Sequence, residues 1–314
     1  MITSETLSTG ASTRRLGFLL AASGAVLFSA KAILAKFQFR YGLDALDVMA
    51  LRMGFSLPLF ALLAVRETRR ARTPLTRRDA GVIVVLGVLG YYLSSLLDFW
   101  GLQYVPVSLE RLILFLNPTF VLLLGVLAFK RKVARREWVA LAVSYAGVVL
   151  VFFESLRLDG KHLMLGSALV LLAALAYAMY LALSGQLIQR VGSLRLVAYA
   201  MLTSTAATLI HYLLAREPAH LLQLPAPAYA YALANAVFCT FLPVTMTMAA
   251  VARIGSSNVA QLSAMGPVSL LFLGGWLLDE AVTPVQIVGT VVVLGSVLLL
   301  TRPGANSVPL AKNS

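Results

Sequence analysis

Long apolar stretches separated by short polar loops recur along the whole chain of 314 residues. A helix needs about 20 apolar residues to cross a bilayer, and ten stretches approach or exceed that length. The pattern therefore predicts an all-α polytopic membrane protein with about ten transmembrane helices. We expect these spans at residues 17–39, 46–65, 80–104, 107–129, 138–153, 163–184, 196–214, 228–252, 257–277 and 284–301.

The composition supports a membrane location and argues against a nucleic-acid binder. Hydrophobic residues make up 60% of the chain and charged residues only 12%, whereas soluble proteins carry about a quarter charged residues. A soluble core of this size could not bury so much apolar surface, but a lipid bilayer can. The net charge of +13 lies mainly in short loops between apolar stretches. It therefore lacks the single solvated basic face that nucleic acids bind.

The same basic residues predict how the chain is threaded through the membrane. With the N-terminus in the cytoplasm, eighteen Lys and Arg residues fall on the cytoplasmic side and four on the other. Cytoplasmic loops carry the excess of positive charge, so this bias supports an even number of spans. Residues 1–16 and 302–314 then form cytoplasmic ends, and we expect the membrane to be the inner membrane of a bacterium.

The chain also repeats itself at a constant offset of 149 residues, so that Gly17 matches Gly166 and Pro118 matches Pro267. The two units, 17–153 and 163–301, each hold five predicted spans, and an odd number turns the second unit upside down. The loop at 130–132 is basic and its counterpart at 279–280 acidic, as expected for opposite sides. Two inverted five-helix repeats around a central cavity are typical of secondary transporters.

Two prolines mark the expected position of a central site. Pro118 and Pro267 fall in the middle of predicted spans four and nine. Each removes a backbone donor and leaves the carbonyl one turn earlier without its helical partner. Paired interruptions in corresponding positions point to the binding site of a transporter. A kink that only improves helix packing is the alternative.

Six ionisable residues are candidates for the site because they lie inside the predicted spans, in the outward third of the first unit: Lys31, Lys36, Arg52, Asp98, Glu110 and Arg111. Each costs about 2.5–3.5 kcal/mol at a helix centre, so we expect these side chains to face water, one another, or both. Four cations and two acids leave an excess of two positive charges, which favours an anionic or zwitterionic substrate. For Lys31 and Arg52, structural ion pairing is the alternative to substrate binding. For Asp98, Glu110 and Arg111 it is the favoured interpretation. Lys36 is expected to reach the lipid headgroups.

Uncharged polar and aromatic residues extend the predicted site. Asn117 follows Glu110 by seven residues, hence on the same helix face, and Tyr180 matches Lys31 at the repeat offset. A site with a charged half and an aromatic, amide-lined half suits a small polar molecule with an apolar or ring portion. The predicted substrate-binding residues are Lys31, Arg52, Tyr91, Asp98, Glu110, Arg111, Asn117, Pro118, Tyr177, Tyr180, Asn235, Gln261 and Pro267.

No sequence motif predicts an enzyme, a metal site or a cofactor. The chain has neither a His-Glu-x-x-His pair nor a phosphate-binding Gly-x-x-x-x-Gly-Lys loop. Asp98 and Glu110 are acids inside the predicted spans of the site, so protons are one candidate coupling partner and a counter-substrate the other. The oligomeric state is left open. Two competing interpretations remain. One is a channel or sensor, which would use the same helices without alternating access, and the other is an intramembrane enzyme with Asp98 and Glu110 as an acid pair.

The sequence resembles the EamA-type branch of the drug/metabolite transporter superfamily. The match is clearest from Gly266-Pro267 through the acidic loop at 279–283 to Gly289 and Gly295, and looser from Asn117-Pro118 to Gly147. In the first unit Arg131 stands where the second has Glu280. The resemblance covers about residues 17–301 and implies ten helices around a central cavity opened alternately to either side. It further implies transport of a small metabolite, such as an amino acid, a nucleobase or a drug, outward more often than inward.

Overall fold

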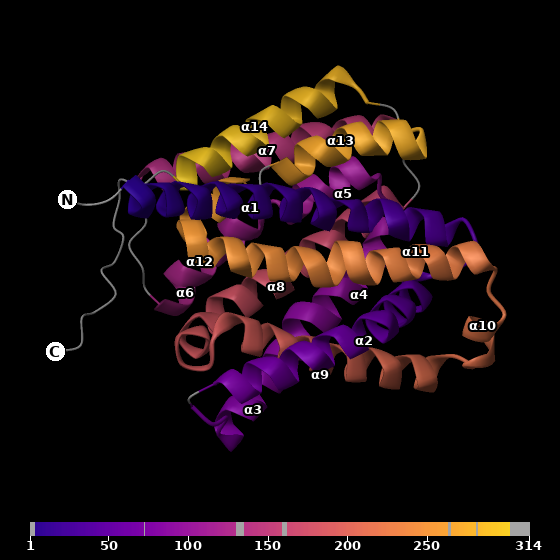
Figure 1. Cartoon of the computed structure of the whole chain (residues 1–314). Helices are drawn as coiled ribbons and strands as arrows, with labels where there is room; N and C mark the ends of the chain where they lie inside the picture. The colour runs from indigo at the N-terminus through magenta and orange to yellow at the C-terminus, as the bar shows by residue number, and fades with distance from the viewer. Residues whose placement is uncertain are drawn as a thin grey trace.

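The computed structural model describes residues 4–301 apart from 72, 130–134, 159–161, 263–264 and 281. Every regular element in this part is helical (Figure 1). Two of these elements, η1 and η2, are short π-helical turns. The first unit contains α1 (Ser4–Phe39), α2 (Ala45–Arg70), α3 (Arg77–Gly87), η1 (Val88–Leu93), α4 (Ser94–Leu102), α5 (Val107–Leu114), α6 (Asn117–Phe129) and α7 (Arg135–Leu158). The second contains α8 (Leu163–Val191), α9 (Ser193–Ala215), α10 (Ala219–Leu222), α11 (Ala226–Ala236), η2 (Val237–Phe241), α12 (Leu242–Leu262), α13 (Met265–Leu278) and α14 (Pro284–Thr301).

Several of these helices are long and apolar enough to cross a bilayer, which confirms an all-α integral membrane protein. Within the described residues, six helical runs meet that criterion: Thr13–Phe39, Ala45–Arg70, Arg77–Leu102, Leu163–Gly185, Ser193–Ala215 and Ala226–Ala250. Shorter apolar helices cover Ala142–Ser155, Gly266–Leu278 and Pro284–Ser296. Ten spans were expected, and part of the difference arises in spans four and nine.

The fourth predicted span, 107–129, is divided into two helices. α5 ends at Leu114 and α6 begins at Asn117, so Pro118 lies in the first turn of α6 and not in the middle of a helix. A proline is tolerated there because the first turn of a helix has no acceptor for a backbone N–H. The interruption expected from Pro118 is therefore present, but as a break between helices. The side chain of Pro118 lies outside the described residues.

The ninth predicted span begins later than expected. α12 continues through residues 253–262, where a loop and the start of a span were predicted, and α13 begins at Met265. Pro267 consequently occupies the first turn of α13, as Pro118 does in α6. The helix continues here because Ile254 and Val259 are buried against Ala21 of α1, and such packing overrides weak local helix propensity. The side chain of Gln261 also lies outside the described part of the chain.

The helices of the two units pack in matching pairs. At the repeat offset α1 corresponds to α8, and α4 corresponds to α12. In the structure α1 lies along α12 and α8 lies along α4 (Figure 1). The second helices, α2 and α9, lie along each other, and so do the last ones, α7 and α14. The contacts of one unit thus have counterparts in the other. The first helix of each unit, α1 or α8, packs against a helix of the other unit.

Glycines allow two of these pairs to approach closely. A Cβ on Gly101 of α4 would lie 2.7 Å from the Gly166 carbonyl oxygen of α8, and one on Gly166 would lie 2.9 Å from that of Gly101. Gly147 of α7 and Gly289 of α14 have the same relation, at 3.0 Å in both directions. Small residues bring helix backbones into contact where lipid offers no hydrophobic driving force. This close α4–α8 packing fixes the helix that carries Asp98 and Tyr91.

Candidate functional site

Five charged side chains from four helices of the first unit gather in one buried region. Lys31 of α1, Arg52 of α2, Asp98 of α4, and Glu110 and Arg111 of α5 are each between 0% and 6% exposed. Placing charges in an apolar interior requires partners or a polar ligand. The sequence predicted that these residues face one another or water, and the structure brings all five together.

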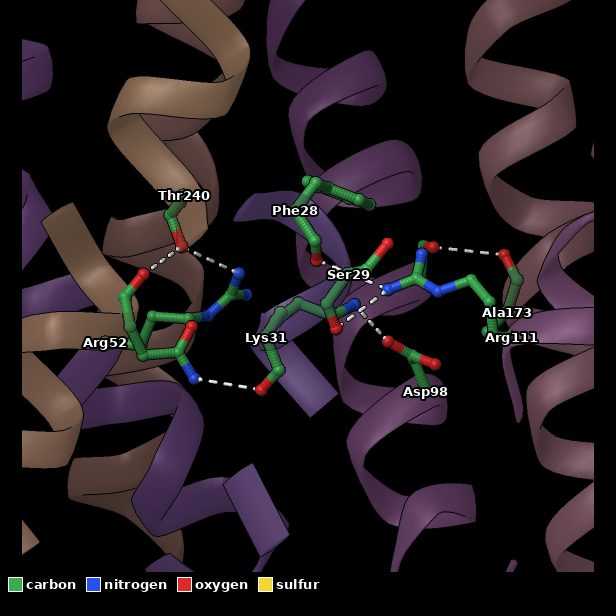
Figure 2. Close-up of polar contacts among 10 residues, drawn as sticks. Phe28, Ser29, Lys31, Arg52, Asp98, Arg111, Ala173 and Thr240 are labelled. Carbon is green, nitrogen blue, oxygen red and sulfur yellow. Dashed lines mark hydrogen bonds and ion pairs between the residues drawn. The ribbon is translucent and has the colours of Figure 1, made fainter. Parts of the chain in front are cut away.

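Lys31 and Asp98 form an ion pair across α1 and α4. The Lys31 Nζ lies 2.5 Å from Asp98 Oδ2, and Figure 2 shows the lysine amine pointing at this carboxylate. The amine also lies 5.4 Å and 5.2 Å from the ring centroids of Phe28 and Phe99, within cation–π range. The Lys31 charge is therefore largely satisfied by the protein.

Arg111 is held by the backbone of α1. Its Nη2 donates to the carbonyl oxygens of Phe28, at 3.2 Å, and Ser29, at 3.3 Å. The Ser29 hydroxyl donates in turn to the Ala25 carbonyl at 2.8 Å, which is one turn earlier. Because two of its hydrogen bonds join α5 to α1 (Figure 2), Arg111 acts mainly as a structural connection between these helices.

Arg52 is the least satisfied cation of the cluster. Its Nη1 donates to Thr240 Oγ1 at 3.4 Å, while Nε and Nη2 are buried without a hydrogen-bond partner among the described residues. The Phe99 ring lies over the guanidinium with its centroid 4.9 Å from Cζ. Two of the three guanidinium nitrogens therefore remain available to a ligand.

Glu110 is the least satisfied acid. It is fully buried, and neither carboxylate oxygen has a hydrogen-bond donor within the described part of the structure. The charged groups that act on this carboxyl group are Asp98, Arg111 and Lys31. A buried carboxylate without donors is costly, so Glu110 is suited to receive a proton or a cationic group.

The second unit contributes polar groups to the same region through α11 and η2. Asn235 Nδ2 donates to the Lys31 carbonyl at 3.4 Å, and its Oδ1 is buried without a partner in the described residues. Thr240 of η2 donates to the Asn235 carbonyl at 2.9 Å and accepts from Arg52. Thr240 was missed by the sequence analysis. It matches Tyr91 at the offset of 149 residues, so applying the repeat to each predicted residue would have found it.

Three tyrosines form a separate aromatic cluster where η1 meets α8. The Tyr91 hydroxyl donates to the Tyr180 hydroxyl at 3.3 Å, and the Tyr177 and Tyr180 rings are stacked with centroids 5.6 Å apart. Seven residues of helix, roughly 10 Å along its axis, separate Tyr91 from Asp98. The structure therefore divides the predicted site into a charged part and an aromatic part on the same helical run.

The remaining predicted residues lie around these two parts. Asn117, at the start of α6, is partly exposed and has a buried Oδ1 without a hydrogen-bond partner among the described residues. Pro267 is buried at the start of α13, next to Gly266, where a Cβ would lie 2.7 Å from Ser29 Oγ. The first turn of α13 thus contacts α1 close to the Arg111 attachment.

Glu280, in the loop between α13 and α14, connects the second unit to the start of α5. Its carboxylate accepts from the Val107 backbone N–H at 3.0 Å and 3.2 Å. Burial is the dominant influence and raises the pKa of Glu280 above its ordinary value, although these backbone donors and Lys36 act in the opposite direction. The acidic loop recognised in the sequence therefore caps a helix of the other unit.

The repeated helical architecture matches a known protein family. The model of the EamA-like transporter family matches residues 15–153 and again residues 164–302. The chain belongs to the EamA-like transporter family. The two matches correspond to the two units seen in the contacts, and family membership agrees with a non-enzymatic membrane protein. Within the described residues, no group of three or more His, Cys, Asp or Glu side chains could hold a metal ion.

Three EamA-like relatives and one solved structure illustrate the similarity. The chain is 29% identical over 277 residues to the uncharacterized transporter YcbK of Bacillus subtilis, covering 85% of this chain and 86% of that protein. It is 22% identical over 235 residues to YyaM of the same species, covering 74% and 76%. A probable amino-acid metabolite efflux pump of Salmonella typhimurium is 25% identical over 256 residues, covering 78% and 83%. A protein crystal structure shares the fold, with a TM-score of 0.64, 14% identity and coverage of 91% of this chain and 96% of its own.

Proposed function

We propose that this EamA-like protein is a secondary transporter that carries a small organic metabolite across the bacterial inner membrane by alternating access. In this proposal the chain crosses the membrane ten times, with the two units inverted and both termini in the cytoplasm. The charged cluster at the unit boundary forms the central site. Family membership and the transporter relatives support the transport role.

The observation that carries the proposal is the set of unsatisfied polar groups where the two units meet. Arg52, Glu110 and Asn235 each place at least one buried polar atom without a partner among the described residues. A purely structural network would leave each such group at a cost of about 1–3 kcal/mol, more for charges. A polar substrate that enters from either side would satisfy these groups. Buried polar groups that lack partners in the protein are therefore expected in a binding site, where the substrate supplies the partners.

The substrate is proposed to be amino-acid-, nucleobase- or drug-like, and export to be its direction. The similarity to the Salmonella relative, a probable amino-acid metabolite efflux pump, supports both points for this chain. Glu110 and Asp98 are the acids of the central site, so coupling to protons is proposed to act through this pair, and exchange against a counter-substrate is the other form of coupling.

Flux measurements in proteoliposomes test the transport proposal. Radiolabelled amino acids, nucleobases and a cationic dye are offered to purified protein, with and without a pH gradient, and Arg52→Gln is compared with the control Arg195→Gln. Arg195 is another buried arginine, outside the charged cluster, and its Nη1 donates to the Thr73 carbonyl at 2.8 Å. Saturable flux that Arg52→Gln abolishes and Arg195→Gln retains is expected. Flux proportional to concentration at all levels would indicate a channel and contradict the carrier.

Topology is tested separately by tags of equal size in the two repeat-related loops. One tag is inserted at residues 130–136 and the other at 279–283, and each is probed with an impermeant reagent in right-side-out cells. The first tag is expected to be protected and the second labelled. Labelling of both would exclude the inverted arrangement.

A further inference from the structure

The two π-helical turns occupy matching positions in the two units. η1 begins at Val88 and η2 at Val237, and 237 minus 88 gives the same offset of 149 residues that relates Pro118 to Pro267. A π-turn inserts one extra residue into a helix and shifts a side chain out of the regular ladder, frequently at functional sites. At this offset Tyr91 and Thr240 are equivalent, so each turn presents a hydroxyl group toward the boundary of the units.

In η2 that hydroxyl has a defined orientation. Thr240 Oγ1 donates its single proton to the carbonyl of Asn235, five residues earlier, at 2.9 Å. The same oxygen can therefore act only as an acceptor toward Arg52, whose Nη1 lies 3.4 Å away. Both side chains are buried, Thr240 at 3% and Arg52 at 4% exposure. The π-turn thus fixes one end of the guanidinium group.

The opposite edge of that group has no partner. Nε and Nη2 are the two nitrogens left without hydrogen bonds in the described part of the chain. Because the guanidinium group is planar, one N–H of each lies in that plane along the same edge, and the two point the same way. This edge matches the two oxygens of a carboxylate in a bidentate arrangement. Phe99 covers the flat face of the group, which leaves the edge as the direction of approach.

The neighbouring cations are engaged by the protein. Lys31 pairs with Asp98, and Arg111 donates to two carbonyls of α1. The five clustered charges, three cations and two acids, carry a formal excess of one positive charge, and Arg52 is the cation of this cluster with an unsatisfied edge on two nitrogens. An added carboxylate would neutralise the cluster.

We propose that the Nε–Nη2 edge of Arg52 binds a carboxylate group of the transported molecule and that Thr240, on the π-turn η2, is the residue that positions it. This inference rests on the proposed transport function, because the edge must become accessible to solute during transport. The ligand is a carboxylate, either a simple organic acid or the acid end of an amino acid. Thr240 acts through Arg52 and does not itself contact the solute.

Cys239 provides a probe that needs no engineered cysteine. It is the single cysteine of the sequence, it is 1% exposed and it precedes Thr240 in η2. Lys31, Arg52 and Arg111 are the charged groups that act on its thiol. Methanethiosulfonates of similar size carrying a sulfonate or a trimethylammonium group are applied to the protein in proteoliposomes, and each rate is divided by that of a free thiol in solution. The normalised ratio is expected to favour the anionic reagent several-fold, and Arg52→Gln is expected to bring it close to one.

Ligand stabilisation tests the carboxylate directly. The L-amino acids, their carboxamides and the matching acids without an amino group are screened by thermal unfolding of the full protein in detergent. A ligand stabilises the state that it binds, so at least one acid should stabilise the wild type while its amide should not. Thr240→Val should weaken the apparent affinity several-fold, and Thr240→Ser should restore it. Stabilisation by the acid without an amino group identifies an organic acid, and stabilisation by the amino acid alone identifies an amino-acid substrate.

The outcomes separate this inference from the transport proposal. Absence of Cys239 modification by either reagent, together with absence of saturable flux, would contradict the transport proposal itself. If the normalised reagent ratio is the same in the wild type and Arg52→Gln, while the wild type shows saturable flux, the carboxylate site alone is overturned. An amide that stabilises the protein as well as its acid would have the same consequence. If Thr240→Val retains the wild-type affinity, Thr240 does not position Arg52. Should no compound of the panel stabilise the protein, the Cys239 ratio decides. Arg52→Lys provides a second variant if Arg52→Gln does not fold.

Discussion

Removal of Asp98 should expose how strongly the ion pair with Lys31 matters to the fold. The two charges are 2.5 Å apart, and Coulomb's law with an effective dielectric constant of about 20 gives an attraction of roughly 7 kcal/mol. Desolvation of both groups costs several kcal/mol per ion, so the pair contributes little in total. Asp98→Asn is nevertheless expected to destabilise the protein by about 3–5 kcal/mol, because it leaves the Lys31 ammonium buried without its counter-charge.

The assay is a double-mutant cycle measured by unfolding in detergent micelles. Asp98→Asn, Lys31→Met and the double variant Lys31→Met/Asp98→Leu are compared with the wild type. Each single variant should lose stability, whereas the double variant should recover most of it, since an apolar pair of similar volume replaces a buried ion pair at little cost. Adding Glu110→Gln to Asp98→Asn should deepen the loss, because Glu110 is the other acid that acts within this cluster.

Two results would refute the reasoning. A wild-type stability for Asp98→Asn would mean that Lys31 reaches water or lipid headgroups and does not depend on Asp98. If the double variant is as unstable as Asp98→Asn, then an apolar pair cannot replace the two charged residues. The loss of stability in the single variant would then not come from an unpaired Lys31 charge.

Two further predictions follow from residues outside the charged cluster. Because burial raises the pKa of Glu280 above the ordinary value of 4.5, the folded protein holds this proton more tightly than the unfolded chain. Stability should therefore fall as pH rises from about 4.5 through the raised pKa, and Glu280→Gln should remove that part of the pH dependence in unfolding curves. Gly166→Ala should destabilise by about 1–3 kcal/mol, because its Cβ would lie 2.7 Å from Tyr104 Cβ. Gly185→Ala, with nothing within 4 Å of the added Cβ, is the matched control, and equal effects of both would contradict the close α4–α8 packing.

The helical membrane class and the two units could be predicted because they depend on local properties of the chain. About 20 consecutive apolar residues indicate a membrane span. Matching residues at one constant offset, such as Gly17 and Gly166, indicate a repeat. The broken span at Pro118 was anticipated for the same reason, since proline limits its own backbone wherever it stands. Its form as two helices was not, because that depends on how α5 and α6 pack.

The sequence by itself placed five charged residues of the cluster inside apolar spans, but only the tertiary structure decided what each one does. The structure also buries Arg195, which lies between two predicted spans. Hydropathy does not distinguish Lys31, Arg52 and Arg111. In the structure, Lys31 pairs with Asp98, Arg52 keeps an edge without hydrogen bonds, and Arg111 joins α5 to α1. That division depends on distances between α1, α2, α4 and α5, which no local pattern records. The π-turn at Thr240 likewise was not predicted from the sequence, and in the structure it packs against α1 and α2 of the other unit. The sequence therefore shows which spans carry charged residues, and the packing of the surrounding helices decides what each charged residue does.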